Sequence, residues 1–362
     1  MNTTHIVRRL NTIAVIVSLT MIGVSSNGNE SPEKISHYAQ NNLVADLPDV
    51  AELQDTNLVN AWGISFGPNT PFWISDNGTG LATLYTVTND SSGTEIVTKA
   101  GLEVTIPGEG TPTGQVFNDV GGFNGNIFLF VSEDGTVSGW RGALGTSAEV
   151  LTNRAGGVYK GVTLATFAGG PALLAANFAE ATVDVYDTNA NLIAQLQDSD
   201  APAGYAPFNV QIVDGVVFVT FALQDSAKHD DVAGRGHGLI DVLDTGTGQF
   251  HRFATGSAAG GKIHEMSSPW GVTLAPSTFG RHAGDLLVGN FGSGTIMTFD
   301  ASGGFQGLLK GKHGAVKISG LWALKFGNGT KAGDADTLFF SAGPDGENHG
   351  LFGSLRPAAK DE

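Results

Sequence analysis

Short apolar segments separated by turn residues run along the chain from residue 60 to residue 355. In the first unit, the apolar segment Asn60–Phe66 is followed by a turn rich in Gly, Pro and Asn, then by Phe72–Ser75, a polar turn and Thr83–Val87. Segments of this length that are rich in β-branched and aromatic residues predict strands and not helices. A fourth segment is readable in some units, for example Leu102–Ile106. The pattern therefore predicts an all-β protein built from short antiparallel strands.

A motif that begins each unit occurs six times in the chain. Its copies read NAWGISF, PTGQVF, YKGVTL, PFNVQI, PWGVTL and LWALKF. The equivalent positions of these copies are Trp62, Thr113, Lys160, Phe208, Trp270 and Trp322. Four-stranded units of about fifty residues are typical of β-propeller blades. We therefore predict a six-bladed β-propeller in preference to two β-sandwiches, which would not produce a six-fold repeat.

The last unit has only three predicted strands after Leu321. A strand-like segment, Tyr38–Leu47, lies upstream of the first unit. We expect this segment to take the outer position of the last blade, because closing the ring would hide the sheet edges that separate blades expose. The predicted propeller covers residues 38–356, and residues 357–362 form a charged tail.

Residues 1–26 have the pattern of a secretory signal peptide. Arg8 and Arg9 precede the apolar run Leu10–Val24, and the small residues Ser25 and Ser26 follow it. The run is shorter than the roughly 20 residues that a membrane-spanning helix needs, which disfavours the alternative of a single membrane anchor. We therefore expect cleavage of 1–26, a flexible leader at 27–37, no stable membrane anchor, and a secreted, periplasmic or extracellular protein.

The composition supports a globular, turn-rich and acidic protein. Apolar residues make up 41% of the chain, and 52 of the 362 residues are Gly. The 35 acidic and 19 basic residues give a net charge of −16, which disfavours nucleic acid and anionic membrane surfaces as partners. A cationic or neutral ligand is more compatible with this charge. The chain has no Cys, which excludes disulfides, a Cys zinc site and a thiol nucleophile.

Several segments of the chain resemble a known family. They are NLVNAWGISFGPNTPFWISDNGTG, SEDGTVSGW, GYAPFNVQ, DDVAGRGHG, GDLLVGNFGSG and SAGPDGENHGLFGSL. These segments resemble an uncharacterised family of secreted bacterial propeller proteins that is also present in giant viruses. More distantly, the chain is similar to the NHL-repeat and gluconolactonase-like superfamily, which includes calcium-dependent lactonases and phosphotriesterases. At that distance the resemblance implies the fold, and function does not follow from it.

Two sets of residues are expected at one end of the propeller axis. The starts of the inner strands and the turns after the second strands open on the same face, which we term the top face. The first set is the six equivalent motif residues, of which four are aromatic. The second set is the turns themselves: Asp76–Asn77, Glu133–Asp134, Asn177, Gln224–His237, Asn290 and Asp345–His349. From these turns, the candidate ligand-binding residues are Asp76, Asn77, Asn177, Asn290, Asp231 and His237. We expect both sets to line a mouth that binds a ligand.

The first set allows more than one interpretation. Trp and Phe around an entrance can clamp an apolar, aromatic or sugar-like ligand, or a cation over a ring face. They can equally be packing residues, because inner strands line a narrow channel. Lys160 could be desolvated among the rings, which would lower its pKa and permit acid–base chemistry, or it could pair with a nearby carboxylate.

The resemblance to the gluconolactonase-like enzymes implies a calcium ion on the axis, held by Glu, Asn and Asp at the inner-strand starts. Of the six residues at these positions here, only Thr113 offers an oxygen ligand, whereas calcium takes about 6–8. Axial calcium is therefore disfavoured, and no cofactor is predicted. The turn carboxylates Asp76, Asp134 and Asp345 could still hold a cation, but Asp-Asn-Gly and Glu-Asp-Gly sequences also favour tight turns for conformational reasons.

The fourth unit is longer than the others because of the segment Gln224–His237, which is rich in His and Asp. Long polar loops on rigid scaffolds often carry function. The segment predicts either a metal site formed by His229, Asp230, Asp231 and His237, or an ordered Ω-loop pinned by Asp231 and Arg235.

Two functional hypotheses follow from these observations. The first is a secreted propeller that binds a small molecule, a glycan or a protein at its top-face aromatic mouth. The alternative is a lactonase- or phosphotriesterase-like hydrolase, or a lyase, that uses acid–base residues of the top face. The missing axial oxygen ligands favour the first hypothesis.

Overall fold

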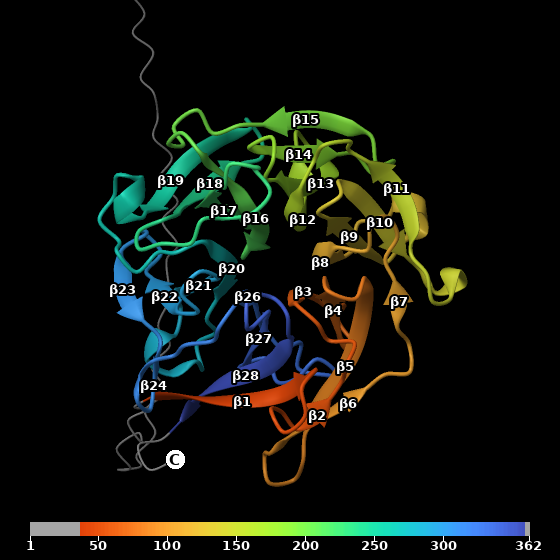
Figure 1. Cartoon of the computed structure of the whole chain (residues 1–362), viewed down its shortest axis with the longest axis vertical. Helices are drawn as coiled ribbons and strands as arrows, with labels where there is room; N and C mark the ends of the chain where they lie inside the picture. The colour runs from red at the N-terminus through yellow and green to blue at the C-terminus, as the bar shows by residue number, and fades with distance from the viewer. Residues whose placement is uncertain (1–36, 359–362) are drawn as a thin grey trace, which may run out of the picture. The chain divides into compact units, whose positions relative to one another are not determined.

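The structure of the protein, a computed structural model, describes residues 37–358. Six sheets of four or five strands surround a central axis, as Figure 1 shows, and form the blades of a β-propeller. This arrangement confirms the predicted fold. The expected signal peptide at 1–26 lies outside the described residues. Within residues 37–358, no helix is long and apolar enough to span a membrane.

The first three blades each start at the axis and end at the outer edge. Blade 1 contains β3 (Ala61–Ser65), β4 (Phe72–Asp76), β5 (Leu81–Asn89), β6 (Glu95–Lys99) and the short β7 (Val104–Thr105). Blade 2 contains β8 (Pro112–Phe117), β9 (Phe128–Ser132), β10 (Thr136–Trp140) and β11 (Glu149–Asn153). Blade 3 contains β12 (Tyr159–Phe167), β13 (Gly170–Asn177), β14 (Thr182–Tyr186) and β15 (Leu192–Leu196).

The remaining three blades continue around the axis. Blade 4 contains β16 (Tyr205–Val213), β17 (Val216–Leu223), β18 (Leu239–Asp244) and β19 (Gln249–Thr255). Blade 5 contains β20 (Pro269–Leu274), β21 (Leu286–Asn290), β22 (Ile296–Phe299) and β23 (Phe305–Leu308). Blade 6 contains β26 (Leu321–Phe326), β27 (Leu338–Ala342), β28 (Leu351–Ala358), β1 (His37–Ala45) and β2 (Leu53–Gln54). Short connecting elements are the hairpin of β24 (Lys310–Gly311) and β25 (Gly314–Ala315) and the 3-10 turns Phe123–Gly125, Gly142–Leu144, Ser257–Ala259 and Gly280–His282.

The N-terminal strand closes the ring, as the sequence predicts. Strand β1 pairs antiparallel with β28, so that His37 lies opposite Ala358 and Ala45 lies opposite Leu351. The paired strands of the propeller therefore extend from His37 to Ala358, compared with the predicted 38–356.

The predicted fourth strand of blade 1 is wrong in position. The outer strand is β6 at Glu95–Lys99, whereas Leu102–Ile106 contributes only the two-residue β7, which pairs with the beginning of β5. Along β6, buried and more exposed residues alternate, so its sequence carries a weaker apolar signal than an inner strand does. The more apolar segment downstream therefore gave a misleading indication.

The inner strands approach one another closely around the axis, and small residues permit this. A Cβ atom on Gly63 would lie 2.5 Å from the carbonyl oxygen of Thr113, and one on Gly271 would lie 2.6 Å from that of Trp322. Glycine is therefore required directly after the motif residue in blades 1 and 5, where the neighbouring inner strand is too close for a Cβ atom.

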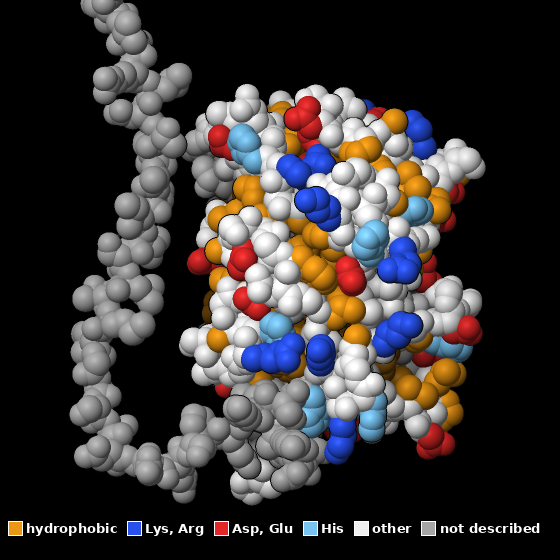
Figure 2. Space-filling view, turned by 90° about the vertical axis from the view of Figure 1, so that its left-hand side faces the viewer, with side chains coloured by type: hydrophobic (Ala, Val, Ile, Leu, Met, Phe, Trp, Pro, Cys, Tyr) orange, Lys and Arg blue, Asp and Glu red, His pale blue; other side chains and the backbone are white. Residues whose placement is uncertain are grey.

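Basic side chains are prominent on one side of the propeller (Figure 2). Figure 2 shows the side that lies on the left in Figure 1, near β22–β24, where Lys, Arg and His side chains are prominent among hydrophobic and acidic ones. This side is not dominated by acidic residues, although the chain carries a net charge of −16.

Candidate functional site

Each inner strand carries an irregularity in its pairing at the repeated motif. In β3 the register shifts between Ala61 and Ile64, and in β20 it shifts between Pro269 and Val272. The inner strands of the other four blades show comparable shifts at the same place. A β-bulge re-aims side chains, and here it lies where the motif residues of all six blades approach the axis.

Five aromatic side chains, which we term the axial aromatic cluster, pack together around the axis. They are Trp62, Phe208, Trp270, Phe291 and Trp322. Trp322 is central: its ring stacks on Trp62 with centroids 3.6 Å apart and on Phe291 at 3.9 Å. The four motif aromatics are only 1–4% exposed. This arrangement matches the packing interpretation. Ligand contact by these rings stays a prediction, and it would require the cluster to open.

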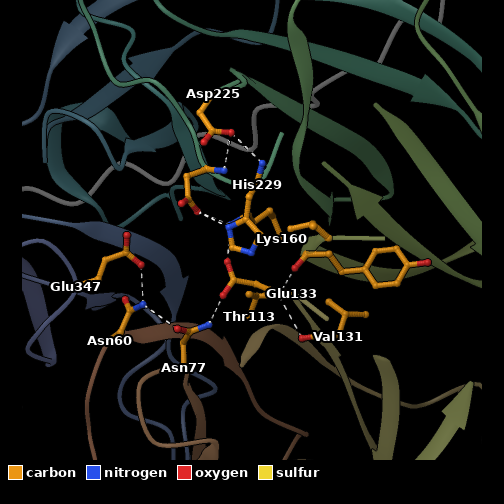
Figure 3. Close-up of polar contacts among 12 residues, drawn as sticks. Asn60, Asn77, Thr113, Val131, Glu133, Lys160, Asp225, His229 and Glu347 are labelled. Carbon is orange, nitrogen blue, oxygen red and sulfur yellow. Dashed lines mark hydrogen bonds and ion pairs between the residues drawn. The ribbon is translucent and has the colours of Figure 1, made fainter. Parts of the chain in front are cut away.

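Seven polar residues form a second layer beside the aromatic cluster, which we term the axial polar network. They are Asn60, Asn77, Glu133, Lys160, His229, Asp230 and Glu347 (Figure 3). Lys160 lies in β12, and the others come from the segment before β3 and from loops that follow second strands. The network therefore joins blades 1, 2, 3, 4 and 6 at one end of the axis.

One half of the network is a chain of amide and carboxyl groups. Asn60 Nδ2 donates to Glu347 Oε2 at 2.7 Å and to Asn77 Oδ1 at 3.2 Å. Asn77 Nδ2 donates to Glu133 Oε2 at 2.9 Å. The indole Nε1 of Trp322 donates to Asn60 Oδ1 at 2.9 Å, which connects the network to the aromatic cluster. The orientation of the Asn60 amide is therefore fixed from both of its ends.

Lys160 is at the centre of the other half of the network. Its side chain is only 2% exposed, and its Nζ donates to Glu133 Oε1 and, at 3.4 Å, to Asp230 Oδ1. The same Nζ lies 5.2 Å from the centroid of the Trp62 ring. His229 Nδ1 contacts Asp230 Oδ1 at 2.8 Å. Of the two interpretations of Lys160, the structure shows the ion pair.

The carboxyl groups near the network differ in their pKa. Burial raises the pKa of Glu347, against the effect of the hydrogen bond from Asn60. Burial also raises the pKa of Asp231. For Asp230, the desolvation that would raise its pKa is outweighed by the Lys160 ammonium and His229, so its pKa is lowered. Two neighbouring carboxyl groups, those of Asp230 and Glu347, are thus biased toward opposite protonation states.

Two residues of the network are in an uncommon backbone conformation. Asn60 has a φ of 47° and Glu347 a φ of 69°, both in the left-handed region that favours glycine. Such backbone strain is concentrated at functional sites in proteins, where surrounding contacts hold it in place. The hydrogen bond between these two side chains therefore joins two strained positions.

The long loop of blade 4 supplies His229 and Asp230 but is not pinned as predicted. Asp225 Oδ1 accepts hydrogen bonds from the backbone N–H groups of His229 at 2.9 Å and Asp230 at 3.3 Å. Residues Gln224 and Asp231 form an isolated β-bridge at the base of the loop. Within residues 37–358 there is no ion pair between Asp231 and Arg235, so the proposed pin is replaced by Asp225 and backbone pairing. His237 Nδ1 donates to the Val232 carbonyl at 2.8 Å.

Three other predicted site residues make structural hydrogen bonds within a blade or between neighbouring blades: Thr113, Asn177 and Asn290. Thr113 Oγ1 donates to the Tyr159 carbonyl at 2.7 Å, and Asn177 Nδ2 donates to Asp184 Oδ2 at 3.0 Å. Asn290 Oδ1 accepts from the Ser267 N–H at 2.9 Å. Asp76 is completely buried, and burial raises its pKa well above its ordinary value.

Of the two remaining turn carboxylates, Asp134 stabilises the backbone of its turn, as the conformational interpretation of the turn sequence predicts. Asp134 accepts from the backbone N–H groups of Glu109 at 2.7 Å and Thr136 at 2.9 Å. Asp345 is 3.9 Å from His349 and largely exposed. Of the twelve predicted site residues, Lys160 and Asn77 belong to the polar network. Sequence reasoning missed Asn60. It placed Glu133, His229, Asp230 and Glu347 in the turns of the top face and named His229 and Asp230 as metal-ligand candidates, but it selected none of the four as ligand-binding residues.

The donors of the network do not fit calcium. One ligand atom each from Glu133, His229 and Asp230 lies within 4.8 Å of the others, which resembles the start of a metal site. The Lys160 ammonium, however, already binds oxygens of Glu133 and Asp230. Three donors, two of which already bind a tethered cation, are far from the 6–8 oxygens that calcium takes. We therefore derive no metal chemistry from this site.

Comparisons with known proteins agree with the fold. No protein-family model matches the chain. It is 28% identical over 342 residues to the uncharacterized protein R648 of Acanthamoeba polyphaga mimivirus, covering 89% of this chain and 80% of that protein. It is also 28% identical over 344 residues to the uncharacterized mimivirus protein L690, covering 89% and 86%.

Among solved structures, virginiamycin B lyase from Staphylococcus aureus aligns with a TM-score of 0.51 and 12% identity, over 88% of this chain and 99% of that one. A Bacteroides thetaiotaomicron protein of unknown function aligns with a TM-score of 0.51 and 11% identity, over 88% and 76%. Likeness at this level shows the fold alone. The expected similarity to giant-virus proteins is thus confirmed, and the chain is similar along most of its length to uncharacterized mimivirus proteins.

Proposed function

We propose that the protein binds a small polar molecule with a cationic group at the axial polar network. The observation that carries the proposal is the balance of charge there. Carboxyl groups of Glu133, Asp230 and Glu347 meet at one end of the axis, and the one ammonium group among them is that of Lys160. The net charge of −16 adds a field that attracts cations to such a site.

Exposure indicates the side from which the ligand enters. Lys160 is buried, whereas the Asp230 side chain is 68% exposed and that of His229 is 45% exposed. A ligand ammonium would therefore meet the Asp230 carboxylate first, on the side of the blade 4 loop. The Asn77 amide, which is oriented by its hydrogen bonds to Asn60 and Glu133, can contact a hydroxyl group of the same ligand. Because the aromatic rings are buried, this polar layer replaces the expected aromatic mouth as the proposed binding surface.

The test is isothermal titration calorimetry with putrescine, a diamine, in low-salt buffer, with glucose and CaCl₂ as separate titrants. We expect putrescine to bind, and its affinity to fall at least about tenfold in Asp230→Asn and in Glu347→Gln, because a hydrogen bond to a charged group contributes about 1.5–3 kcal/mol. The matched control is Asp300→Asn, which removes the same charge from an exposed turn of blade 5. Equal binding in all three variants, or heat from glucose alone, would contradict the proposal.

A second candidate function, acid–base catalysis by a hydrolase or lyase, is favoured by one observation. Glu347, whose pKa is raised by burial, is a carboxyl group suited to donating a proton, and the same network holds the ionised Asp230. The measurement is turnover of lactone and phosphotriester substrates by the wild type and by Glu347→Gln. Turnover that disappears in this variant would support the enzyme over the binding protein.

We also propose that the protein is exported and that residues 1–26 are cleaved, as their signal-peptide pattern indicates. The test is the intact mass of the protein recovered from the medium or periplasm, which should lack about 26 N-terminal residues.

A further inference from the structure

The opposite end of the axis holds a second ring of residues from the same repeat. Three positions after the motif residue, the inner strands carry Ser65, Val116, Thr163, Gln211, Thr273 and Lys325. Five of these six side chains are polar, although they occur in strands that are otherwise apolar. Since a strand rises about 3.3 Å per residue, the ring lies roughly 10 Å along the strands from the aromatic cluster. Packing of an apolar core does not explain this polar ring.

All of these residues except Thr273 line a cavity of about 200 Å³, to which every one of the six inner strands contributes residues. We term it the Lys325 cavity; its polar lining comprises Ser65, Gln115, Thr163, Asn209, Gln211 and Lys325. Its apolar lining includes Phe66 and Phe117, and Trp270 of the aromatic cluster also borders it. At about 30 Å³ per water molecule, this space corresponds to roughly seven waters, which suits a ligand of about six heavy atoms.

Part of the polar lining is already satisfied within the protein. The Ser65 hydroxyl donates to Gln115 Oε1 at 3.0 Å, and Gln115 Nε2 donates to the carbonyls of Gly63 at 2.8 Å and Trp73 at 3.0 Å. Asn209 Nδ2 donates to the Trp270 carbonyl at 2.9 Å. These groups form a rigid frame around the cavity.

The remaining polar groups are donors that have no acceptor in the described part of the chain. The Lys325 ammonium makes no hydrogen bond or ion pair there, and its nearest aromatic ring is Phe66, with the centroid 5.1 Å away. The Gln211 amide N–H groups donate to no residue in 37–358. The Thr163 hydroxyl oxygen accepts from the Ile212 N–H at 3.2 Å, which leaves its O–H to donate. Among the lining residues there is no Asp or Glu.

We propose that the Lys325 cavity binds the carboxylate of a small organic acid, which accepts hydrogen bonds from Lys325, Gln211 and Thr163. The short apolar part of the acid packs against Phe66 and Phe117. A half-buried cation is costly without a counter-charge, and this cavity supplies donors on several sides but no anion of its own. The two ends of the axis thus have complementary chemistry: carboxylates around the polar network, and a cation with neutral donors around the Lys325 cavity.

The test is calorimetric titration with sodium butyrate, in parallel with butyramide and inorganic phosphate. Butyramide has the same shape as butyrate and no charge. We expect butyrate to bind, butyramide to bind at least tenfold more weakly, and the difference to disappear in Lys325→Met. The matched control Lys310→Met, in the exposed hairpin β24–β25, retains wild-type affinity. Gln211→Leu and Thr163→Val each weaken butyrate binding about threefold or more.

Folding and pH provide independent controls. Lys325→Met removes an unpaired charge, so its urea unfolding midpoint is expected to equal or exceed that of the wild type. A loss of binding in this variant would then not be due to a loss of structure.

The pH dependence of binding is the second control. Burial lowers the pKa of Lys325. Butyrate affinity should therefore fall as the pH rises through the pKa of this group, and in Lys325→Met it should not change over that range. Equal binding of butyrate and butyramide, wild-type affinity in Lys325→Met, or phosphate binding without butyrate binding would each overturn the proposal.

Discussion

Replacing Trp322 by Ala tests whether the axial aromatic cluster holds the blades together. Trp322 is 1% exposed, stacks on Trp62 and Phe291, and donates a hydrogen bond to Asn60. Removal of a buried Trp side chain costs about 3–5 kcal/mol, and each stacked pair contributes about 0.5–1.5 kcal/mol beyond its buried area. Since part of these terms overlaps, we expect a loss of about 4–6 kcal/mol in the free energy of unfolding.

The measurement is the urea unfolding midpoint at 25 °C, followed by far-UV circular dichroism. The control is Trp140→Ala in β10, because Trp140 is also buried and its Nε1 donates to the Gly145 carbonyl. Among residues 37–358, however, its ring has one aromatic neighbour, Trp73, with the ring centroids 4.9 Å apart. Trp322→Ala should lower the midpoint more than Trp140→Ala does. Trp322→Phe keeps a ring for stacking and loses the indole N–H, so it should recover most of the stability. If Trp322→Ala were as stable as Trp140→Ala, the cluster would not be the principal contact among the inner strands.

Two further predictions concern buried charges. Lys160→Met leaves the Glu133 carboxylate, which is 11% exposed, without its charged partner, so we expect a loss of about 3–5 kcal/mol in the free energy of unfolding by urea. The double variant Lys160→Met/Glu133→Gln should recover most of this loss, and a double variant no more stable than the single one would contradict this reasoning. Burial raises the pKa of Asp76 in the folded protein, so its carboxyl group holds the proton more tightly in the folded than in the unfolded state. The stability that this proton contributes is fully present below the unfolded pKa of about 4, and it is lost as the pH rises through the folded pKa. Asp76→Asn should therefore raise the urea midpoint at pH 7 and change it little at pH 4, and an equal effect at both pH values would show that the carboxyl is not neutral in the folded state.

The repeat made the fold predictable from the sequence, because the motif and its turns recur in each blade and apolar inner strands give a strong signal. The outer strands are less predictable, since strands such as β6 expose alternate residues to solvent. Ring closure could be predicted because the sixth unit lacks a strand and Tyr38–Leu47 supplies one. The positions of Lys160 and Asn77 at the axial end follow from the same repeat.

The remaining site residues depend on contacts between different blades. Glu133 and Asn77 occupy similar turns, but the turn sequence does not show that both reach the axis and share a hydrogen bond. His229 and Asp230 come from a loop without a counterpart in the other blades, so no repeat could align them with Lys160. Glu347 reaches Asn60 through a left-handed backbone conformation, which nothing in a Gly-rich turn sequence specifies for a Glu.

The geometry of the repeat explains why one axis can carry two separate polar sites. The bulge at the motif directs six residues toward one end, and the position three residues later lines the other end. Between them, the small residues after the motif bring neighbouring inner strands into close contact, as at Gly63 and Gly271. The aromatic cluster occupies the same level, with Trp270 bordering the Lys325 cavity and Trp322 hydrogen-bonded to the polar network. Because this layer is buried and apolar, it separates the carboxylates of one site from the ammonium of the other. A charge-removing substitution at one end should therefore leave ligand binding at the other end unchanged.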